Sequence, residues 1–361
     1  MARLVDPDFW RGRSVFVTGH TGFKGAWLSL WLQSMGAHVT GFADEVPTNP
    51  SLFELARAGD RLIDVRGDVR DHEAVLDAVA GHAPEIVIHM AAQPFVRRSF
   101  LDPRTTYETN VMGTVNVLEA VRATPSARVV VNVTSDKCYD NHPSRPPRPF
   151  GEDDPKGGHD PYSSSKGCAE LVADAYLRSF FASDVGGPRL ASVRAGNVIG
   201  GGDWGEERLI PDIMRGALDG TPIAVRNPEA VRPWQHVLNP LSGYLRLAQR
   251  LHESADYQGG WNFGPALDDA QPVRTIADRL TELWPGELQW ELDHRPHPHE
   301  AHFLALDSTK AREQLGWRPT WNLDEALAGI VAWYGALRDG EDMQAVTLEQ
   351  IAAFEAAGSP A

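Results

Sequence analysis

Residues 14–36 read SVFVTGHTGFKGAWLSLWLQSMG, an apolar run, a glycine-rich turn and then a long run of mostly apolar residues. Gly19, Gly22 and Gly25 stand three residues apart in the turn. Glycines allow a tight turn and a close backbone approach to a ligand, and the N-terminus of the following helix offers N–H groups to an anion. Close packing between a strand and a helix would also suit such a turn, so the surrounding segments must decide between the two interpretations.

Over the first 200 residues, short apolar runs typical of strands alternate with longer amphipathic segments typical of helices. We expect strands at 14–19, 38–43, 61–69, 85–92, 128–135 and 191–200. We expect helices at 24–35, 71–80, 104–123 and 162–182. With a glycine turn after the first strand, this alternation predicts an α/β fold with a doubly wound parallel (Rossmann) sheet, whose ligand lies beyond the carboxyl ends of the strands.

After about residue 200, prolines and tryptophans become frequent and the alternation weakens. This change predicts a second, smaller α/β domain that binds the substrate, while a helix at 235–251 and a strand at 259–265 return to the first domain. The expected limits are 1–200 plus roughly 235–268 for the dinucleotide-binding domain, and 201–234 plus 269–361 for the substrate domain.

The composition excludes several classes of protein. A formal net charge of -15 argues against nucleic acid or an anionic membrane surface as a partner. With two cysteines, Cys138 and Cys168, a disulfide framework is excluded, and we expect a cytoplasmic protein. We expect neither a signal peptide nor a membrane span. Four histidines occur in HRPHPHEAH (294–302), but prolines and the spacing argue against a metal site.

Tyr162 and Lys166 stand four residues apart in YSSSK, so they share one face of the expected helix. A neighbouring ammonium lowers the pKa of a phenol, which would let Tyr162 act as a base near neutral pH. A YxxxK pattern alone is more often solvated surface. Following a glycine-rich turn and a strand that ends in VTS, it is far more specific for a catalytic pair.

At this point the chain resembles the extended short-chain dehydrogenase/reductase family over nearly its whole length. The resemblance rests on the glycine spacing, DVRD (68–71), HMAAQ (89–93), Asn110 and the Tyr162–Lys166 pair. Within the family, it is similar to nucleotide-sugar 4,6-dehydratases that act on CDP-glucose. The segments that carry this closer likeness are TGHTGFKGAWLSLWL, HMAAQPFVRRSF, TSDKCYDN, PYSSSKGCAELV, RAGNVIGGGDW and RPWQHVLNPLSGYL.

The resemblance implies an internal oxidation and reduction of the sugar with tightly bound NAD. Tyr162 would take the proton of the 4-hydroxyl, with Ser135 hydrogen-bonded beside it. Asp136 would protonate the departing 6-hydroxyl. Relatives that act on dTDP-glucose carry an Asp-Glu pair here, whereas this chain has Asp136 and Lys137. Lys137 would be either the base that removes the carbon 5 proton, which we favour, or a cation that orients the sugar.

The binding residues follow from the motifs and from the resemblance. No Arg or Lys occurs between residues 38 and 56, which favours NAD over NADP. The expected cofactor-binding residues are Gly19, Thr21, Gly22, Phe23, Lys24, Gly25, Asp44, Asp68, Val69, Ala91, Ala92, Gln93, Asn110, Tyr162 and Lys166. The expected substrate-binding residues are Gln93, Asn197, Leu209, Arg215, Arg232, Gln235 and Arg295.

Other functions remain open at the level of sequence. The nearest is an epimerase or a dehydratase for another nucleotide sugar, although a simple 4-epimerase needs no acid such as Asp136 for a departing hydroxyl. A non-catalytic NAD-binding scaffold is a further alternative, but it has no need of the Tyr162–Lys166 pair. Family members commonly pair through helices equivalent to 104–123 and 162–182, which implies a homodimer or homotetramer.

Overall fold

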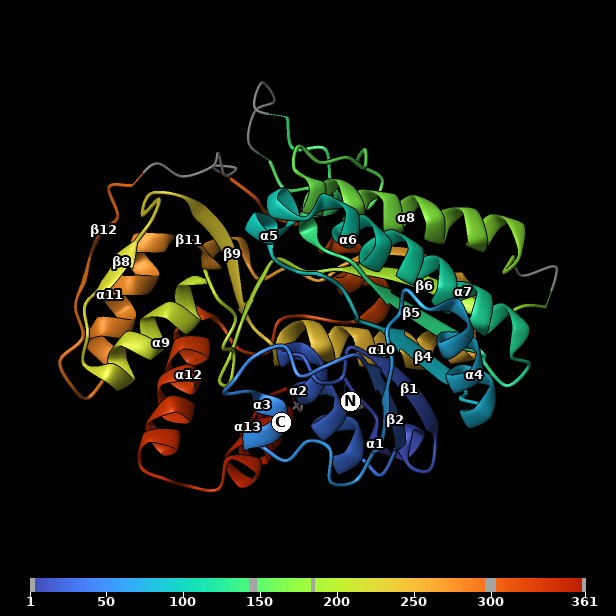
Figure 1. Ribbon diagram of the computed structural model, residues 1–361, viewed down its shortest axis with the longest axis horizontal. Coiled ribbons are helices and arrows are strands. Elements are labelled where there is room, and N and C mark those ends of the chain that lie inside the picture. Colours follow the sequence, from blue (N-terminus) through green and yellow to red (C-terminus); the bar gives the residue numbers. More distant parts are fainter. Residues whose placement is uncertain (1–3, 143–147, 183–185, 296–302, 359–361) are drawn as a thin grey trace.

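The computed structural model describes residues 4–142, 148–182, 186–295 and 303–358. Its central sheet has seven parallel strands in the order β10-β6-β5-β4-β1-β2-β3 (Figure 1). In chain order these strands are β1 (Ser14–Thr18), β2 (His38–Ala43), β3 (Ile63–Arg66), β4 (Ile86–His89), β5 (Val129–Val133), β6 (Arg189–Arg194) and β10 (Gly259–Asn262). The order reverses between β1 and β4, so the predicted doubly wound sheet is confirmed and the glycine turn lies at its switch point.

Helices cover both faces of this sheet. The long ones are α2 (Phe23–Ser34), α4 (His72–His82), α7 (Gly113–Ala123), α8 (Pro161–Ser179) and α10 (Leu238–Glu253). Val15 and Val17 belong to the core that α2 and α10 share, whereas Phe16 packs in a second core with α4 and α7. Because alternate residues face two apolar layers, β1, β4 and β5 are continuous runs of buried side chains with few polar members.

Shorter helices connect these elements. They are α1 (Pro7–Trp10), α3 (Leu52–Leu55), α5 (Val96–Leu101), α6 (Pro103–Tyr107) and a π-helical turn, Glu108–Met112, that continues into α7. The predicted helix 104–123 is therefore α6, the π-helical turn and α7 end to end. Its interruption brings Asn110 toward the carboxyl end of β4, where it contacts Gln93.

A smaller unit lies beside the carboxyl ends of the central strands, on the left in Figure 1. It contains a three-stranded sheet, a two-stranded sheet and their helices: β7 (Asn197–Ile199), β9 (Val231–His236), β11 (Ala270–Pro272), β8 (Ile223–Val225), β12 (Trp290–Leu292), α9 (Leu209–Asp219), α11 (Val273–Leu283) and α12 (Leu323–Arg338). The last helix, α13 (Met343–Ala357), contacts both α12 and α2.

Two predicted strands differ from the observed ones. The predicted strand 191–200 is wrong, because β6 ends at Arg194 and β7 pairs with β9 in the other sheet. The chain passes close to Pro233 between them, since a Cβ on Gly196 would lie 2.4 Å from its Cγ. The predicted strand 61–69 is shorter, Ile63–Arg66. The return strand after residue 258 is confirmed as β10, which pairs with β6. The domain limits stay predictions.

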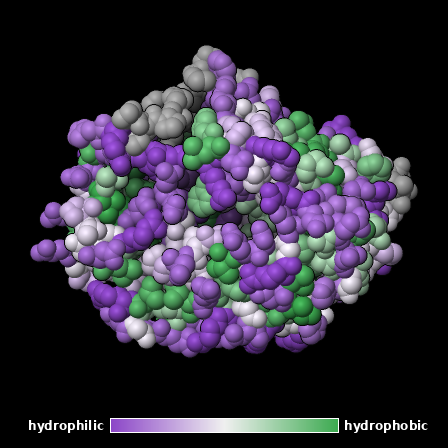
Figure 2. Space-filling view, in the orientation of Figure 1, coloured by the Kyte–Doolittle hydropathy of each residue, from purple (hydrophilic) through white to green (hydrophobic). Residues whose placement is uncertain are grey.

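The surface is mixed in character. On the face shown in Figure 2, hydrophilic residues are interspersed with small hydrophobic patches. In the part of the chain that the structure describes, no helix combines the length and the apolar character that crossing a membrane requires.

Candidate active site

The glycine-rich turn has the geometry of a cradle for an anion. Gly19 has a φ of +73°, and a Cβ there would lie 2.8 Å from the backbone nitrogen of Ala91. A Cβ on Gly25 would lie 2.1 Å from the carbonyl oxygen of Gly19. Gly22 is the N-cap of α2 and makes no side-chain capping bond, so the first N–H groups of the helix face outward. The turn therefore fits the diphosphate of a dinucleotide.

The turn opens into a cavity of about 1010 Å³ between the central sheet and the smaller unit. Its walls bring together most of the predicted site residues: Gly19, Thr21, Gly22, Phe23, Lys24, Gly25, Asp44, Asp68, Val69, Ala91, Ala92, Gln93, Ser135, Asp136, Lys137, Tyr162, Lys166, Asn197, Leu209 and Arg232. A site for one small molecule usually has about 300–1,000 Å³. The cavity is thus large enough for two ligands that meet inside it.

A short turn after β5 carries the predicted acid and its neighbour. Ser135 caps a 3₁₀ turn, Asp136–Cys138. The Ser135 hydroxyl donates to Asp136 Oδ1 at 3.0 Å and accepts from the Lys137 N–H at 3.2 Å. One serine therefore contacts the side chain of Asp136 and the backbone of Lys137.

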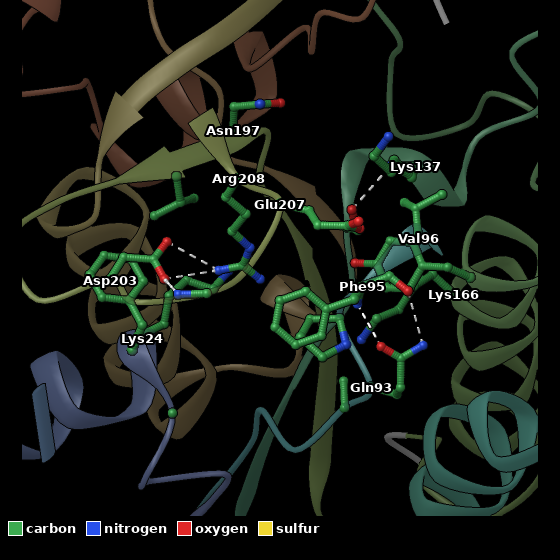
Figure 3. Close-up of a pocket in the computed structure, with 18 of the residues that line it drawn as sticks. Lys24, Gln93, Phe95, Val96, Lys137, Lys166, Asn197, Asp203, Glu207 and Arg208 are labelled. Atoms are coloured by element: carbon green, nitrogen blue, oxygen red, sulfur yellow. Dashed lines mark hydrogen bonds and ion pairs between the residues drawn. The ribbon is translucent and has the colours of Figure 1, made fainter. Parts of the chain in front are cut away.

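Helix α8 supplies the predicted tyrosine and lysine. Asp160 caps the helix by accepting from the Ser163 N–H, and Pro161 occupies the first turn. The Tyr162 N–H donates to Ser99 Oγ at 3.1 Å, and the Lys166 ammonium donates to the Val133 carbonyl at 3.4 Å. Figure 3 shows Lys166 among the residues that line the cavity. Both predicted side chains therefore lie beside the end of β5.

The pKa of Tyr162 departs from the expectation. Burial raises this pKa to about 12, although a hydrogen bond with Ser135 opposes the effect. The expectation of a lowered pKa is therefore wrong for this cavity, because desolvation of the phenolate outweighs the hydrogen bond of Ser135 and the positive charge of Arg208. Arg208, which we did not single out in the sequence, is a cation that lowers the pKa of Tyr162.

Asp136 is a buried carboxyl at the cavity wall. Burial raises its pKa, while Lys137, Ser135 and Arg232 oppose the rise. Its Oδ2 atom is buried and has no hydrogen-bond partner within the described chain. A carboxyl whose pKa is raised by burial and whose one oxygen is uncommitted is suited to exchange a proton with a ligand.

Two lysines, the half-buried Lys24 and the buried Lys166, give the cavity a positive interior despite the negative net charge of the chain. Burial is the main cause that lowers the pKa of Lys24 and of Lys166 to about 8 each. Around Lys24, Arg208 strengthens this effect, while Asp136 and Asp203 oppose it. At pH 7 both lysines are therefore mostly charged, and they favour an anionic ligand.

Arg208 is a residue of the site that sequence reasoning missed. Its guanidinium lies 5.0 Å from the ring centroid of Phe95 and 3.1 Å from the carboxylate of Asp203. Figure 3 shows all three side chains in the cavity. The available signal was its position: Arg208 immediately precedes Leu209 and caps α9, whose N-terminus faces the cavity.

A second missed contact crosses the cavity wall between the two units. Arg97 of α5 donates to Glu207 Oε1 at 3.0 Å. Glu207 has a φ of +58°, and its carbonyl accepts a hydrogen bond from Arg226. The sequence offered no signal for this ion pair, since 110 residues separate Arg97 from Glu207.

Asn110 is a predicted binding residue that lies behind the wall. Its Oδ1 accepts from the Gln93 N–H at 2.8 Å, and its Nδ2 donates to Ser165 Oγ at 2.8 Å. Gln93 itself lines the cavity, and its side chain contacts Phe95. Asn110 therefore links Gln93 to α8 by hydrogen bonds.

Three predicted substrate-binding residues also do not line the cavity and have protein partners instead. Arg215 donates to the Trp204 carbonyl at 3.1 Å, Gln235 donates to the Phe263 carbonyl at 2.8 Å, and Arg295 pairs with Asp293 at 2.7 Å. Direct contact of these residues with a ligand stays a prediction. Of the histidine-rich segment, residues 296–302 lie outside the described residues.

Several known proteins are similar to this chain in sequence. The chain is 53% identical over 358 residues to the CDP-glucose 4,6-dehydratase of Salmonella typhimurium, a match that covers 98% of the chain and 99% of the relative. It is 30% identical over 331 residues to the dTDP-glucose 4,6-dehydratase of Streptomyces griseus, which covers 89% and 93% respectively.

Solved structures show the same fold. The dTDP-glucose 4,6-dehydratase of Streptomyces venezuelae, solved with NAD bound, matches with a TM-score of 0.76 at 25% identity over 92% of this chain and 99% of that one. The UDP-glucose 4-epimerase of Thermotoga maritima matches with a TM-score of 0.77 at 21% identity over 90% and 99%, which shows the fold alone.

A family profile described as GDP-mannose 4,6 dehydratase matches residues 16–330, which include the glycine turn, the segments that carry Asp136 and Tyr162, and most of the smaller unit. With 53% identity to a 4,6-dehydratase over nearly the full length of both chains, the chain belongs to the GDP-mannose 4,6-dehydratase family of extended short-chain dehydrogenases/reductases.

Proposed function

We propose that this protein catalyses the 4,6-dehydration of CDP-D-glucose with tightly bound NAD. The products are CDP-4-dehydro-6-deoxy-D-glucose and water, and the reaction serves deoxysugar biosynthesis. The observation that carries the proposal is the pairing on one wall of Tyr162, hydrogen-bonded to Ser135, with Asp136, whose Oδ2 is buried and without a partner in the described chain. Dehydration needs both groups, whereas epimerisation at carbon 4 needs only the first.

The residues present fit NAD. The glycine turn would hold its diphosphate, and Asp44, Asp68 and Val69 line the end of the cavity where the adenosine would lie. Arg70 lines the same end, but its guanidinium is hydrogen-bonded to Asp68 at 2.8 Å, which leaves the ribose end without strong positive charge for a 2′-phosphate. When bound, the nicotinamide would take a hydride from carbon 4 of the sugar and return it to carbon 6.

Side chains of this protein would move the protons. Tyr162 takes the proton of the 4-hydroxyl, and Ser135 stabilises the phenolate by a hydrogen bond. The pKa of Tyr162 is about 12, so the phenol loses its proton with difficulty near neutral pH. The hydrogen bond of Ser135 and the positive charge of Arg208 lower this pKa and so favour the transfer. Asp136 then gives its proton to the 6-hydroxyl, which leaves as water.

Lys137 is the candidate for removing the proton from carbon 5, which the neighbouring 4-keto group acidifies. It lines the cavity one residue after Asp136, and Figure 3 shows it at the wall near Lys166. The alternative is that Lys137 only orients the sugar. Running the reaction in deuterated water separates the two roles, because a Lys137→Met enzyme that still labels carbon 5 at the parent rate has its base elsewhere.

The smaller unit would bind the CDP part of the substrate. Asn197, Arg208 and Arg232 line the cavity and offer an amide and two guanidinium groups to the diphosphate. Leu209 and Ile223 would contact the cytosine and ribose. The identity of the base rests on the relative from Salmonella typhimurium, which is named for CDP-glucose.

The decisive experiment supplies the purified protein and NAD with CDP-glucose, UDP-glucose or dTDP-glucose in separate reactions. We expect a 4-keto-6-deoxy product from CDP-glucose, at a kcat/KM at least tenfold above the others. A product that keeps its 6-hydroxyl and is inverted at carbon 4 would show an epimerase instead. A protein that binds NAD but turns over none of the three sugars would be the non-catalytic scaffold.

We further propose a cytoplasmic homodimer or homotetramer that pairs through α7 and α8. Large apolar side chains are exposed near this face: Phe100, Leu101, Tyr107, Met112, Leu171 and Phe180. Figure 2 shows hydrophobic patches over the region of α6 and α7. Sedimentation of the parent and of Leu171→Glu tests the interface, since a charge there should favour the monomer.

A further inference from the structure

One buried ion pair contacts the chain on both sides of the turn that carries Asp136 and Lys137. Arg194, at the end of β6, and Glu170, on α8, have side chains that are 4% and 5% exposed. The Arg194 Nε and Nη2 atoms donate to Glu170 Oε1 and Oε2 at 2.8 and 2.7 Å. Neither side chain lines the cavity. The pair therefore acts on a ligand only through other residues.

The contacts of the pair bracket the turn. On the N-terminal side, the Thr134 hydroxyl donates to Glu170 Oε1. On the C-terminal side, Arg194 Nη1 donates to the Tyr139 hydroxyl at 2.6 Å. That hydroxyl in turn donates to Asn262 Oδ1 at 2.7 Å, which ties it to β10. The residues on either side of the turn 135–138, Thr134 and Tyr139, are thus both hydrogen-bonded to the same ion pair.

One member of the pair, Glu170, belongs to α8, the helix that also carries Tyr162, the predicted base for the 4-hydroxyl. Glu170 follows Lys166 by four residues on α8, so the two side chains leave the same face of the helix one turn apart. Glu170 also raises the pKa of Lys166, against the larger lowering by burial. Because Glu170 is part of α8, a displacement of this helix would also displace the ion pair that is hydrogen-bonded to both ends of the turn.

We propose that Arg194 and Glu170 are positioning residues that set the turn 135–138 relative to the Tyr162–Lys166 helix, so that oxidation at carbon 4 and elimination at carbons 5 and 6 act on one pose of the sugar. This inference rests on the proposed dehydratase function. A buried ion pair is often no more stabilising than apolar residues of the same volume. Its fixed geometry is what an apolar pair would not supply.

Two conservative variants, one on each side of the turn, test the proposed positioning role. Thr134→Val and Tyr139→Phe each remove one hydroxyl and keep the shape of the side chain. Since a misplacement of about 1 Å can cost about 10²-fold in rate, we expect elimination to slow by about ten- to a hundredfold. Oxidation at carbon 4 uses Tyr162 and Lys166 of α8 and, from the turn, only the hydrogen bond of Ser135, so it should slow less than elimination. Reduced cofactor should therefore accumulate in single turnovers.

A matched control loses a buried hydroxyl far from the site. Thr347 donates to the Met343 carbonyl and accepts from Trp333 Nε1 at 3.0 Å, between α12 and α13. Thr347→Val should leave the ratio of oxidation to elimination at the parent value. Thermal unfolding of all three variants verifies that they are folded at the assay temperature.

A measurement without substrate keeps this inference separate from the proposed function. Amide hydrogen exchange of residues 135–139 should become faster in Thr134→Val and Tyr139→Phe but not in Thr347→Val. Glu170→Gln, which keeps the shape of the side chain, should also shift the pH profile of the oxidation step to lower pH. Unchanged exchange in folded variants, or an equal loss of both chemical steps, would overturn the positioning role. If the parent protein does not turn over CDP-glucose, the proposed substrate is wrong, whatever the exchange measurement shows.

Discussion

Replacing Lys166 by Met is expected to make the protein more stable and less active. The Lys166 side chain is buried, with the residue 6% exposed, and its ammonium donates to the Val133 carbonyl at a long distance of 3.4 Å. Burial, followed by the charge of Lys24, lowers its pKa from 10.5 to about 8. Methionine has a similar length, keeps the apolar contacts of the stem and carries no charge.

The size and sign of the effect follow from these pKa values. Below pH 8 the lysine is charged in both states, and the lowered pKa corresponds to a penalty on the folded state of about 3 kcal/mol. Between pH 8 and about 10.5 the unfolded chain binds a proton that the folded chain has released, so the stability of the parent rises with pH. The advantage of Lys166→Met should therefore be about 3 kcal/mol at pH 7 and below about 1 kcal/mol at pH 10.

Urea unfolding at the two pH values measures both numbers. Arg178→Met is the matched control, because it removes a charge from the exposed surface of the same helix, where an ion pair with Asp174 is worth only about 0–1 kcal/mol and does not titrate in this range. A Lys166→Met protein that is less stable than the parent at pH 7, or whose advantage is the same at pH 10, would refute the assignment of a strained, charged lysine. Turnover should fall in either case, since the ammonium is part of the site.

The remaining predictions concern the chemical steps. Tyr162→Phe should lower kcat by about 10²–10⁴-fold with little change in stability, measured by steady-state kinetics and urea unfolding, and near-normal turnover would contradict its role as a base. Asp136→Asn should oxidise the sugar but not release water, so that reduced cofactor persists in a single turnover; product formed at the parent rate would exclude Asp136 as the acid. Arg232→Ala and Arg208→Ala should raise KM more than they lower kcat, because the diphosphate is held alike in ground and transition states. Unchanged KM values in both would place the diphosphate elsewhere.

Features that repeat along the chain could be predicted from the sequence. Five of the six predicted strands, the first part of the sixth and their alternation with helices were readable because a sheet buried on both faces demands continuous apolar runs. Glycines at 19, 22 and 25 marked the switch point, and at 19 and 25 only glycine fits the positive φ or the close backbone contact. Tyr162 and Lys166 were recognised because they lie next to these local signals, whereas the role of Asp136 followed from the resemblance to 4,6-dehydratases.

What depends on distant contacts could not be predicted. Arg208 enters the site through Phe95 and Asp203, and Arg97 meets Glu207 across the cavity wall. Residue spacing carries no information on the contacts of Arg208 with Phe95 and of Arg97 with Glu207, since each joins elements that meet only after the sheet and the smaller unit have formed. The prediction of a single strand at 191–200 was wrong for the same reason, because the chain leaves β6 after Arg194 and passes close to Pro233 at Gly196.

The sequence by itself determined the class of fold, the anion-binding turn and the residue types of the chemistry, since these follow from local periodicity and from side-chain identity. Only the tertiary structure decided their protonation. The pKa of Tyr162 is about 12 and that of Lys166 about 8 because burial removes water from both charged forms, an effect that outweighs the neighbouring charges. It also decided how the turn at 135–138 is held, because Arg194 and Glu170 meet only when β6 and α8 pack together.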